Sequence, residues 1–333
     1  MTGHRVVWTQ RGVAEIETFA VPSPQEGQLL LRTRVTLISP GTERAFFLGL
    51  PNTSQKYPQH AGYSNVGEVM AVGAKAEGFQ VGDRVACAAS HSSHVVVRAA
   101  NCLPVPEDAP DEEAVFFNLA AIAMQGVRKA RVELGESVVV VGSGLIGLLA
   151  MQLAKLNGAL PVIAVDKDEG RLSFARQAGA DATVLADDNV LSAVRHLAEA
   201  DGAAVVIEAT GHPEAIPQAF ALAGTFGRVI LLGSTRGETE RVNFYRDVHK
   251  KGLTIIGAHA AMRPRVESSA GWWTTQADQR VALKLLALKR LTVQPLITHR
   301  FPWQDAPHAY ALLKAWDLRA LGMVLNWSNS PVS

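Results

Sequence analysis

Hydrophobic residues in the middle of the chain, from about residue 134 onward, form short apolar runs separated by longer stretches of helical character. The valine- and isoleucine-rich runs predict buried strands at 137–141, 161–165, 183–185, 204–207, 228–232 and 253–256. The stretches between them predict helices at 148–157, 169–178, 190–200 and 213–223. This repeated alternation is typical of an α/β fold with a doubly wound parallel sheet. Right-handed crossovers place the ligand of such a sheet at the carboxyl ends of its strands.

The two ends of the chain show a different pattern. Residues 4–110 interleave apolar runs with proline and glycine, which predicts a β-rich region with strands at 5–8, 28–35, 66–72 and 95–97. After a helix that begins at the acids 111–113, the tail predicts helices at 280–290 and 304–315 and a strand at 322–326. We therefore expect a sheet domain over 119–257. The ends, 1–118 and 258–333, are expected to form one catalytic domain, with the active site in the cleft between the two domains.

A Gly-x-Gly-x-x-Gly turn follows the first strand of the sheet domain. Gly142 permits the tight turn, Gly144 lets the backbone approach a pyrophosphate, and Gly147 lets the following helix pack closely on the strand. Asp166 ends the next strand, about 20 residues beyond the last glycine, where an acid accepts hydrogen bonds from ribose hydroxyls. Because strand, turn, helix and acid all agree, the segment predicts a dinucleotide site.

The predicted cofactor residues extend beyond the glycines. Ser143, Leu145 and Ile146 lie at the helix N-terminus, whose free N–H groups and dipole favour phosphate. Thr210 and Gly233 follow two further strands of the sheet. Asp166 repels a 2′-phosphate, which favours NAD over NADP. Lys167 and Arg171 keep NADP possible, because cations near that ribose can accept a phosphate.

Charge and composition exclude several classes of protein. Lys plus Arg is 32 against 31 for Asp plus Glu, with no basic stripe, so we expect neither nucleic acid nor membrane surface as a partner. Two cysteines in 333 residues form neither a disulfide framework nor a metal cluster. The N-terminus lacks a signal-peptide core. The uncharged stretch 137–154 carries three glycines, which favours a buried strand and helix over a membrane span. We expect a cytoplasmic protein.

Taken together, these features resemble the medium-chain dehydrogenase/reductase superfamily, which includes alcohol, sorbitol and threonine dehydrogenases. Beyond the glycine turn, the resemblance rests on motifs at 22–27, 62–69, 81–85 and 206–211. It implies a GroES-like catalytic domain, a Rossmann domain, and hydride transfer between a nicotinamide and a carbonyl or alcohol. A small-molecule substrate and a homodimer or homotetramer are also implied.

The zinc ligands of that superfamily are replaced in this chain. Ser39 stands where the cysteine of the first motif is expected, and Tyr63 and Ser64 stand where a His-Glu pair is expected. The third expected ligand falls near Asn118. Zinc prefers thiolate, imidazole or carboxylate, so we expect no zinc. The motifs around Ser39 and Tyr63 are similar to a subgroup that includes bacteriochlorophyllide a dehydrogenase.

Without a metal, the substrate oxygen needs hydrogen-bond donors and a proton relay. Thr42 matches the superfamily position whose hydroxyl relays the substrate proton, and Tyr63, Ser64 and His91 are the other candidates for the substrate hydroxyl. Glu43 is expected as a buried structural partner of an arginine rather than as a catalytic group.

The leading hypothesis is a zinc-independent, NAD-dependent dehydrogenase of a secondary alcohol, in a sugar, a polyol or a larger hydroxylated metabolite. The alternatives are an NADPH-dependent quinone or enoyl reductase and a non-catalytic NAD-binding paralogue.

Trp272 and Trp273 are expected to shape a substrate pocket, form a subunit contact or pack on the surface. Arg263 is most simply interpreted as a solvated charge, with an anionic substrate as the less favoured alternative.

Overall fold

The computed structural model describes residues 1–269 and 271–328 and divides the chain into two compact units. The first unit combines Met1–Asn118 with Arg280–Ser333, and the second is Leu119–Gln279. Residues 258–279 therefore lie with the sheet unit rather than with the tail. Three contacts explain this: Gln125 Nε2 donates to the Ala258 carbonyl, Lys129 Nζ to the Met262 carbonyl, and Arg263 Nη2 to the Ala121 carbonyl.

The second unit is built on a six-stranded parallel sheet. In order across the sheet, the strands are β11 (Ala182–Leu185), β10 (Val162–Asp166), β9 (Val138–Val141), β12 (Ala203–Glu208), β13 (Ala223–Leu231) and β14 (Thr254–Gly257). Every pair along this order is parallel, as the strand–helix alternation predicts. All four residues of β9 are buried, because helices cover both faces of the sheet.

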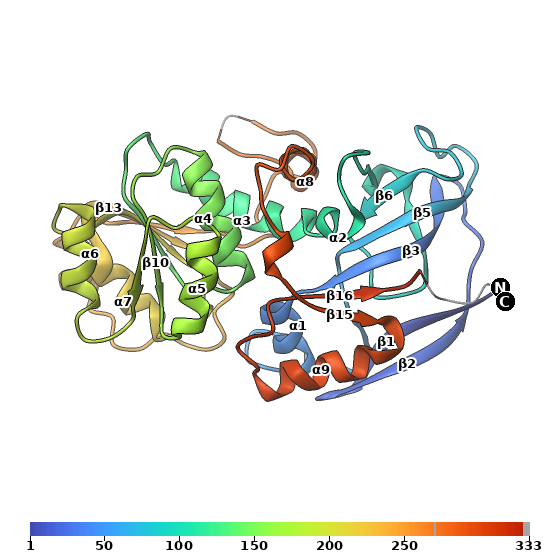
Figure 1. The fold of residues 1–333 in the computed structure, drawn as a ribbon, viewed down its shortest axis with the longest axis horizontal. Helices are drawn as coiled ribbons and strands as arrows, with labels where there is room; N and C mark the ends of the chain where they lie inside the picture. Colours follow the sequence, from blue (N-terminus) through green and yellow to red (C-terminus); the bar gives the residue numbers. More distant parts are fainter. Residues whose placement is uncertain (270, 329–333) are drawn as a thin grey trace. The chain divides into compact units, whose positions relative to one another are not determined.

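The helices of this unit lie on the two faces of the sheet (Figure 1). On one face are α4 (Leu145–Leu156) and α5 (Glu169–Gln177), which contact β9, β10 and β11. On the other are α6 (Val190–Ala198) and α7 (Ala215–Leu222), which contact β12 and each other. The helix α3 (Phe117–Ala130) precedes β9, and Gly126 on it leaves room for Leu232 at the end of β13. A π-helical turn at Tyr245–His249 precedes β14.

The first unit contains two sheets. The larger has the order β15 (Ile297–Pro302), β16 (Gly322–Asn326), β3 (Gln28–Ile38), β5 (Asn65–Val72), β6 (Arg84–Cys87) and β8 (Leu103–Pro104), with β7 (His94–Arg98) also paired to β3. The smaller has the order β2 (Val13–Ala20), β1 (Thr2–Gln10) and β4 (Gln59–His60). The long strand β3 pairs antiparallel with β5, β7 and β16, so the closing strand at 322–326 joins the N-terminal sheet.

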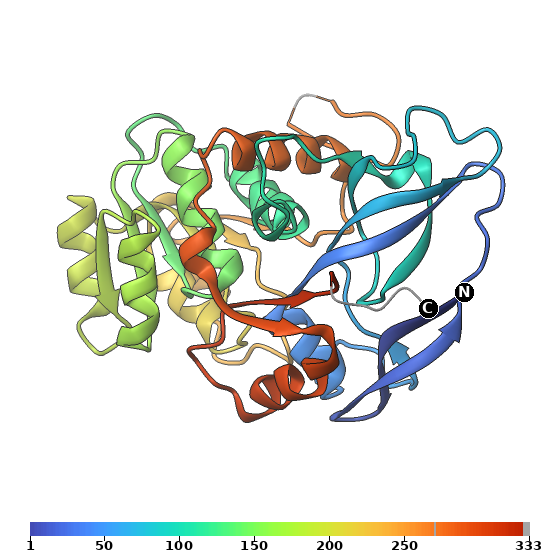
Figure 2. The same cartoon turned by 45° about the vertical axis from the view of Figure 1, so that its right-hand side comes forward.

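Helices close the core of the first unit. α9 (Ala306–Ala315) contacts β2 and α1 (Pro40–Phe47), and Figure 2 shows α9 beside the β1–β2 ribbon. Trp8, Phe47, Trp303, Tyr310 and Trp327 form one buried cluster between these elements. α2 (Asp111–Ala114) is a single acidic turn before α3, and α8 (Thr275–Ala287) links the two units in sequence. Short 3₁₀ turns occur at Ala99–Asn101, Gln294–Leu296 and Trp303–Asp305.

The sequence patterns did not predict α1. The helix begins after Ser39 with Pro40 in its first turn, where the missing proline N–H costs nothing. The uncharged segment 137–154 forms β9 and most of α4, as expected. Within residues 1–269 and 271–328, no helix is both long enough and apolar enough to cross a membrane.

Candidate functional site

The second unit has a topological switch point between β9 and β12. From β9 the chain runs outward through β10 to β11, and it then crosses to β12 on the other side of β9. Glu208 at the end of β12 pairs in register with Val141 at the end of β9. In open α/β sheets the crevice at this point, outside the carboxyl ends of the strands, holds the ligand.

The three glycines of the turn differ in what an added side chain would meet. Gly142 has φ +99°, and a Cβ there would lie 2.7 Å from the Thr210 methyl carbon. A Cβ on Gly147 would lie 1.8 Å from the Gly142 carbonyl oxygen, so the helix start packs directly on the turn. Gly144 has no atom within 4 Å of its Cβ position and an ordinary φ of −77°. Only Gly144 therefore lacks an internal reason to be glycine, as expected where a ligand approaches the backbone.

The start of α4 offers unpaired donors. Gly144 is its N-cap, and Leu145, Ile146 and Gly147 form its first turn, whose N–H groups have no partner within the helix. Ser143 is fully buried, and its Oγ has no hydrogen-bond partner among the described residues. Buried unpartnered polar atoms are rare in proteins, and here one lies beside the turn that is shaped for phosphate.

Asp166 is half-buried at the end of β10 and is tied to the turn. Its Oδ2 accepts from the Ser143 N–H at 2.6 Å and its Oδ1 from the Asp168 N–H at 3.0 Å. A carboxylate has about four acceptor positions, so capacity for ribose hydroxyls remains. Lys167 is exposed and Arg171 half-buried, on the same segment.

Glu208 holds the other side of the crevice in place through hydrogen bonds. The sequence patterns did not single it out, although it lies in the motif 206–211. Its carboxyl is fully buried, and Oε1 accepts from the N–H groups of Thr210 at 2.6 Å and Gly211 at 3.1 Å, and from the Thr210 hydroxyl. A Cβ on Gly233 would lie 2.9 Å from Glu208 Oε2, which has no hydrogen-bond partner in the described chain. Burial raises the pKa of Glu208. This carboxyl fixes Thr210 against Gly142.

These observations fit a bound dinucleotide. The glycine turn leaves space only at Gly144, the first turn of α4 presents N–H groups, and Asp166 ends the neighbouring strand. Two buried oxygens without a hydrogen-bond partner among the described residues lie nearby, that of Ser143 in the turn after β9 and that of Glu208 at the end of the neighbouring strand β12. Five of the predicted cofactor residues therefore lie around the crevice at the carboxyl ends of β9 and β12. They are Gly142, Ser143, Gly144, Thr210 and Gly233.

In the first unit, α1 presents Thr42. Its side chain is half-buried, and its hydroxyl has no hydrogen-bond partner within the described ranges. The next residue, Glu43, is buried, and its Oε1 accepts from the Ser39 N–H at 2.7 Å. Its Oε2 accepts from His91 Nε2 at 3.0 Å and from the Tyr310 hydroxyl. Glu43 therefore fixes the turn of helix that carries Thr42, with histidine and tyrosine as partners instead of the expected arginine.

The structure changes the role that we give to two candidates. His91 has no exposed surface, and its ring packs 2.6 Å from the position of a Cβ on Gly62, which has φ +89°. Ser64 is also fully buried, and its hydroxyl donates to the Val115 carbonyl at 2.6 Å. We expected both side chains to handle the substrate proton. Both are instead interior groups: the Ser64 hydroxyl is bonded to a backbone carbonyl and His91 Nε2 to Glu43, while His91 Nδ1 is buried without a hydrogen-bond partner among the described residues.

The positions where zinc ligands are expected do not form a zinc site. Ser39 is buried, the Ser64 hydroxyl is used by Val115, and Asn118 Nδ2 donates to the Tyr63 carbonyl at 2.8 Å. Hydroxyl and amide groups are poor zinc ligands. Among the described residues, no three His, Cys, Asp or Glu side chains are grouped to hold a metal ion. The residues present do not fit zinc.

Replacing Tyr310 by phenylalanine should lower the free energy of unfolding by about 1.5–3 kcal/mol, because the change removes a buried hydrogen bond to a carboxylate. Tyr57→Phe is the matched control, since that hydroxyl donates to the neutral Phe46 carbonyl at 2.8 Å and should cost about 1 kcal/mol. Urea unfolding of both variants measures the difference. Equal losses of unfolding free energy in the two variants would show that the hydrogen bond from Tyr310 to Glu43 stabilises the protein no more than one to a neutral carbonyl.

Comparisons with known proteins agree with this geometry. The alcohol dehydrogenase GroES-like domain model matches residues 25–116, and the zinc-binding dehydrogenase model matches 146–275. L-threonine 3-dehydrogenase of Pyrococcus furiosus is 28% identical over 336 residues, covering 91% of this chain and 92% of that protein. D-guloside 3-dehydrogenase of Escherichia coli strain K12 is 30% identical over 249 residues, covering 74% and 71%.

A solved structure has the same fold over the whole chain. The short chain alcohol dehydrogenase RspB from E. coli CFT073, complexed with NADH, has a TM-score of 0.84 at 22% identity, covering 98% of this chain and 99% of that one. The chain belongs to the medium-chain dehydrogenase/reductase superfamily and is an NAD(P)-dependent oxidoreductase of the alcohol and polyol dehydrogenase kind.

Proposed function

We propose that this protein is a zinc-independent, NAD-dependent dehydrogenase of a secondary alcohol, carried by a sugar, a polyol or a larger hydroxylated metabolite. The observation that carries the proposal is the donor set at the expected metal positions. Ser39, Tyr63, Ser64 and Asn118 are neutral groups, while the Thr42 hydroxyl has no hydrogen-bond partner in the part of the chain that the structure describes. The description of one matching family names zinc, but residues 146–275, which it matches, include none of these positions.

In this proposal the side chains of the protein handle the proton of the substrate hydroxyl. NAD, when bound at the glycine turn, would supply the hydride acceptor. Thr42 Oγ1 accepts the proton of the substrate hydroxyl as the carbonyl forms, and it passes its own proton on toward solvent. Tyr63 is the second hydroxyl of the substrate half. Glu43, held by three donors, fixes the backbone that positions Thr42. Positioned proton transfer of this kind contributes about 10²–10⁴-fold to a rate.

NAD rather than NADP is proposed because of Asp166. Its carboxylate, tied to the Ser143 N–H, stands where the adenosine ribose is expected, and a negative charge there repels a 2′-phosphate. The same charge argues against the quinone or enoyl reductase alternative, which implies NADPH.

Asp166→Asn should raise the affinity for NADPH relative to NADH by about tenfold, since it removes the charge while its amide oxygen still accepts from one of the two backbone N–H groups. Fluorescence titration of wild type and variant with both reduced cofactors measures the ratio. Glu169→Gln is the control, because this exposed acid lies on the same segment and pairs with Arg176. An unchanged ratio in Asp166→Asn would remove the basis for proposing NAD.

The experiment that tests the proposed activity is a panel of secondary alcohols, sugars and polyols with NAD, followed by the absorbance of the reduced nicotinamide. We expect at least one substrate to be oxidised. Reduction of a quinone or an enoyl compound with NADPH, without oxidation of any alcohol, would show that the protein is a quinone or enoyl reductase instead. Tight NADH binding with no turnover in either assay would indicate a non-catalytic paralogue.

A further inference from the structure

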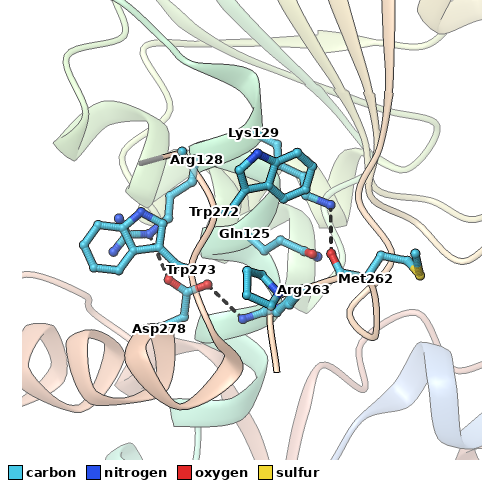
Figure 3. Close-up of a pocket in the computed structure, with 10 residues that line it drawn as sticks. Gln125, Arg128, Lys129, Met262, Arg263, Trp272, Trp273 and Asp278 are labelled. Carbon is cyan, nitrogen blue, oxygen red and sulfur yellow. Dashed lines mark hydrogen bonds and ion pairs between the residues drawn. The ribbon is translucent and has the colours of Figure 1, made fainter. Parts of the chain in front are cut away.

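A small pocket in the second unit gathers cations and indoles outside the glycine turn (Figure 3). Gln125, Arg128 and Lys129 come from the second half of α3, and Arg263, Trp272 and Trp273 come from the segment between β14 and α8. Asp278 joins them from the first turn of α8. We call this the tryptophan pocket. Its cavity of about 10 Å³ admits one water-sized group.

The tryptophan pocket carries an excess of positive charge. Arg263 is buried and pairs with Asp278, with Nη1 2.8 Å from Oδ2, which contradicts the expectation of a solvated arginine. Arg128 Nε lies 2.9 Å from Asp278 Oδ1 as an ion pair, although neither atom makes a hydrogen bond in the described structure. Within the described residues, Lys129 Nζ donates to the carbonyls of Gly257 and Met262, at 3.1 and 3.3 Å, and to no carboxylate. The pocket lining therefore has three cations and one carboxylate, which pairs with the two arginines.

The indoles orient two of these cations. The Arg128 guanidinium carbon lies 3.9 Å from the Trp273 ring centroid, and Lys129 Nζ lies 5.3 Å from that of Trp272. Such contacts contribute about 0.5–1 kcal/mol each at exposed sites, but they leave the charge uncompensated. Trp272 and Trp273 are 49% and 38% exposed, so the pocket opens toward solvent at the indoles.

Donors and acceptors remain unused inside the pocket. An ammonium has three donors, and Lys129 uses two of them. Arg263 Nε is buried with no hydrogen-bond partner in the part of the chain that the structure describes. Gln125 Nε2 donates to the Ala258 carbonyl at 2.6 Å, which leaves its Oε1 buried and unpartnered. Spare donors on cations, with one spare acceptor, suit an oxygen anion that can carry a proton.

We propose that the tryptophan pocket binds the oxyanion group of a small molecule, a carboxylate or a phosphate, at the carboxyl end of β14, with one oxygen in the cavity and the rest of the group at the opening beside the indoles. The anion compensates Arg128 and Lys129, accepts from the third Lys129 donor and from Arg263 Nε, and a protonated oxygen or a water donates to Gln125 Oε1. This site is independent of the proposed dehydrogenase activity, because none of its residues belongs to the glycine turn or to the Thr42 region.

Titration of the full chain with inorganic phosphate and with acetate, followed by tryptophan fluorescence and by calorimetry, tests the proposal. Sodium chloride at the same ionic strength controls for screening. We expect saturable binding of at least one oxyanion and no comparable response to chloride. Lys129→Met should weaken the binding about tenfold or more, since it removes a charge-assisted hydrogen bond. Phosphate and acetate distinguish the two sources of the oxyanion.

Lys250→Met is the matched control, because Lys250 Nζ lies 5.1 Å from the Tyr245 ring as an exposed cation–π pair. It should leave oxyanion binding unchanged. Lys129→Arg should keep most of the affinity, which separates loss of charge from loss of fold. No saturable binding to wild type, or equal weakening by Lys129→Met and Lys250→Met, overturns the proposal. NADH titration of the same samples reports the glycine turn separately, so failure here leaves the proposed function standing.

Discussion

Gly147→Ala should destabilise the second unit by about 3 kcal/mol or more, whereas Gly144→Ala should leave it folded and weaken NADH binding. The difference follows from what each new Cβ meets. At Gly147 it would lie 1.8 Å from the Gly142 carbonyl oxygen, a backbone atom that can move only if the turn opens. At Gly144 nothing lies within 4 Å, so the methyl group would occupy the space that we assign to the pyrophosphate.

Thermal unfolding and NADH titration of both variants measure the two effects separately. Gly144→Ala should keep the wild-type unfolding temperature and raise the Kd for NADH about tenfold or more. Gly135→Ala shows the effect of backbone strain alone on the unfolding temperature. Its φ of +88° is unfavourable for alanine, although no atom lies within 4 Å of the added Cβ. Full NADH affinity in Gly144→Ala would show that the cofactor does not approach this backbone.

Thr42→Val should lower kcat about 100-fold on any alcohol that the panel identifies, with the affinity for NADH unchanged. Valine matches the shape of threonine and removes the one α1 hydroxyl that we assign to the substrate proton. The loss should fall on kcat more than on KM, because proton transfer acts in the transition state. Steady-state kinetics with saturating NAD measures it.

Thr42→Ser restores the hydroxyl and should recover most of the rate, which separates chemistry from packing. His91→Gln should differ from Thr42→Val in its effect on stability. Since His91 is buried and bound to Glu43, its loss should reduce stability as well as rate. A normal kcat in Thr42→Val would remove Thr42 from the mechanism.

Much of the fold could be predicted because its signals are local. The valine run before Gly142 is buried on both faces of the sheet, so its apolar pattern alone predicts a central parallel strand. α1 and β15 were missed for different reasons. α1 is eight residues long and depends on contacts with α9, which is remote in sequence. β15 has a mixed burial pattern and carries His299 and Arg300, which hide its strand character.

The cofactor half of the site could be predicted in the same way, whereas the substrate half could not. Gly142, Gly144, Gly147 and Asp166 lie within one strand–turn–helix–strand segment with a known spacing. Glu43, by contrast, meets His91 and Tyr310 from distant parts of the chain. Whether a polar side chain faces a ligand or a buried partner depends on such long-range packing, which a local pattern does not encode.

In the proposed mechanism, the neutral groups at the expected zinc positions and the Glu43 cluster act together. Where a metal would hold the substrate oxygen, the chain has a helical turn fixed by a buried carboxylate with three donors. We propose that this arrangement positions Thr42 without the help of a metal ion.

Metal analysis of the active enzyme, combined with turnover in the presence of a strong chelator, tests whether the enzyme works without zinc. With the alcohol identified by the panel, we expect well under one zinc per chain and an unchanged kcat after chelation. A stoichiometric, tightly bound zinc whose removal abolishes alcohol oxidation would contradict this expectation.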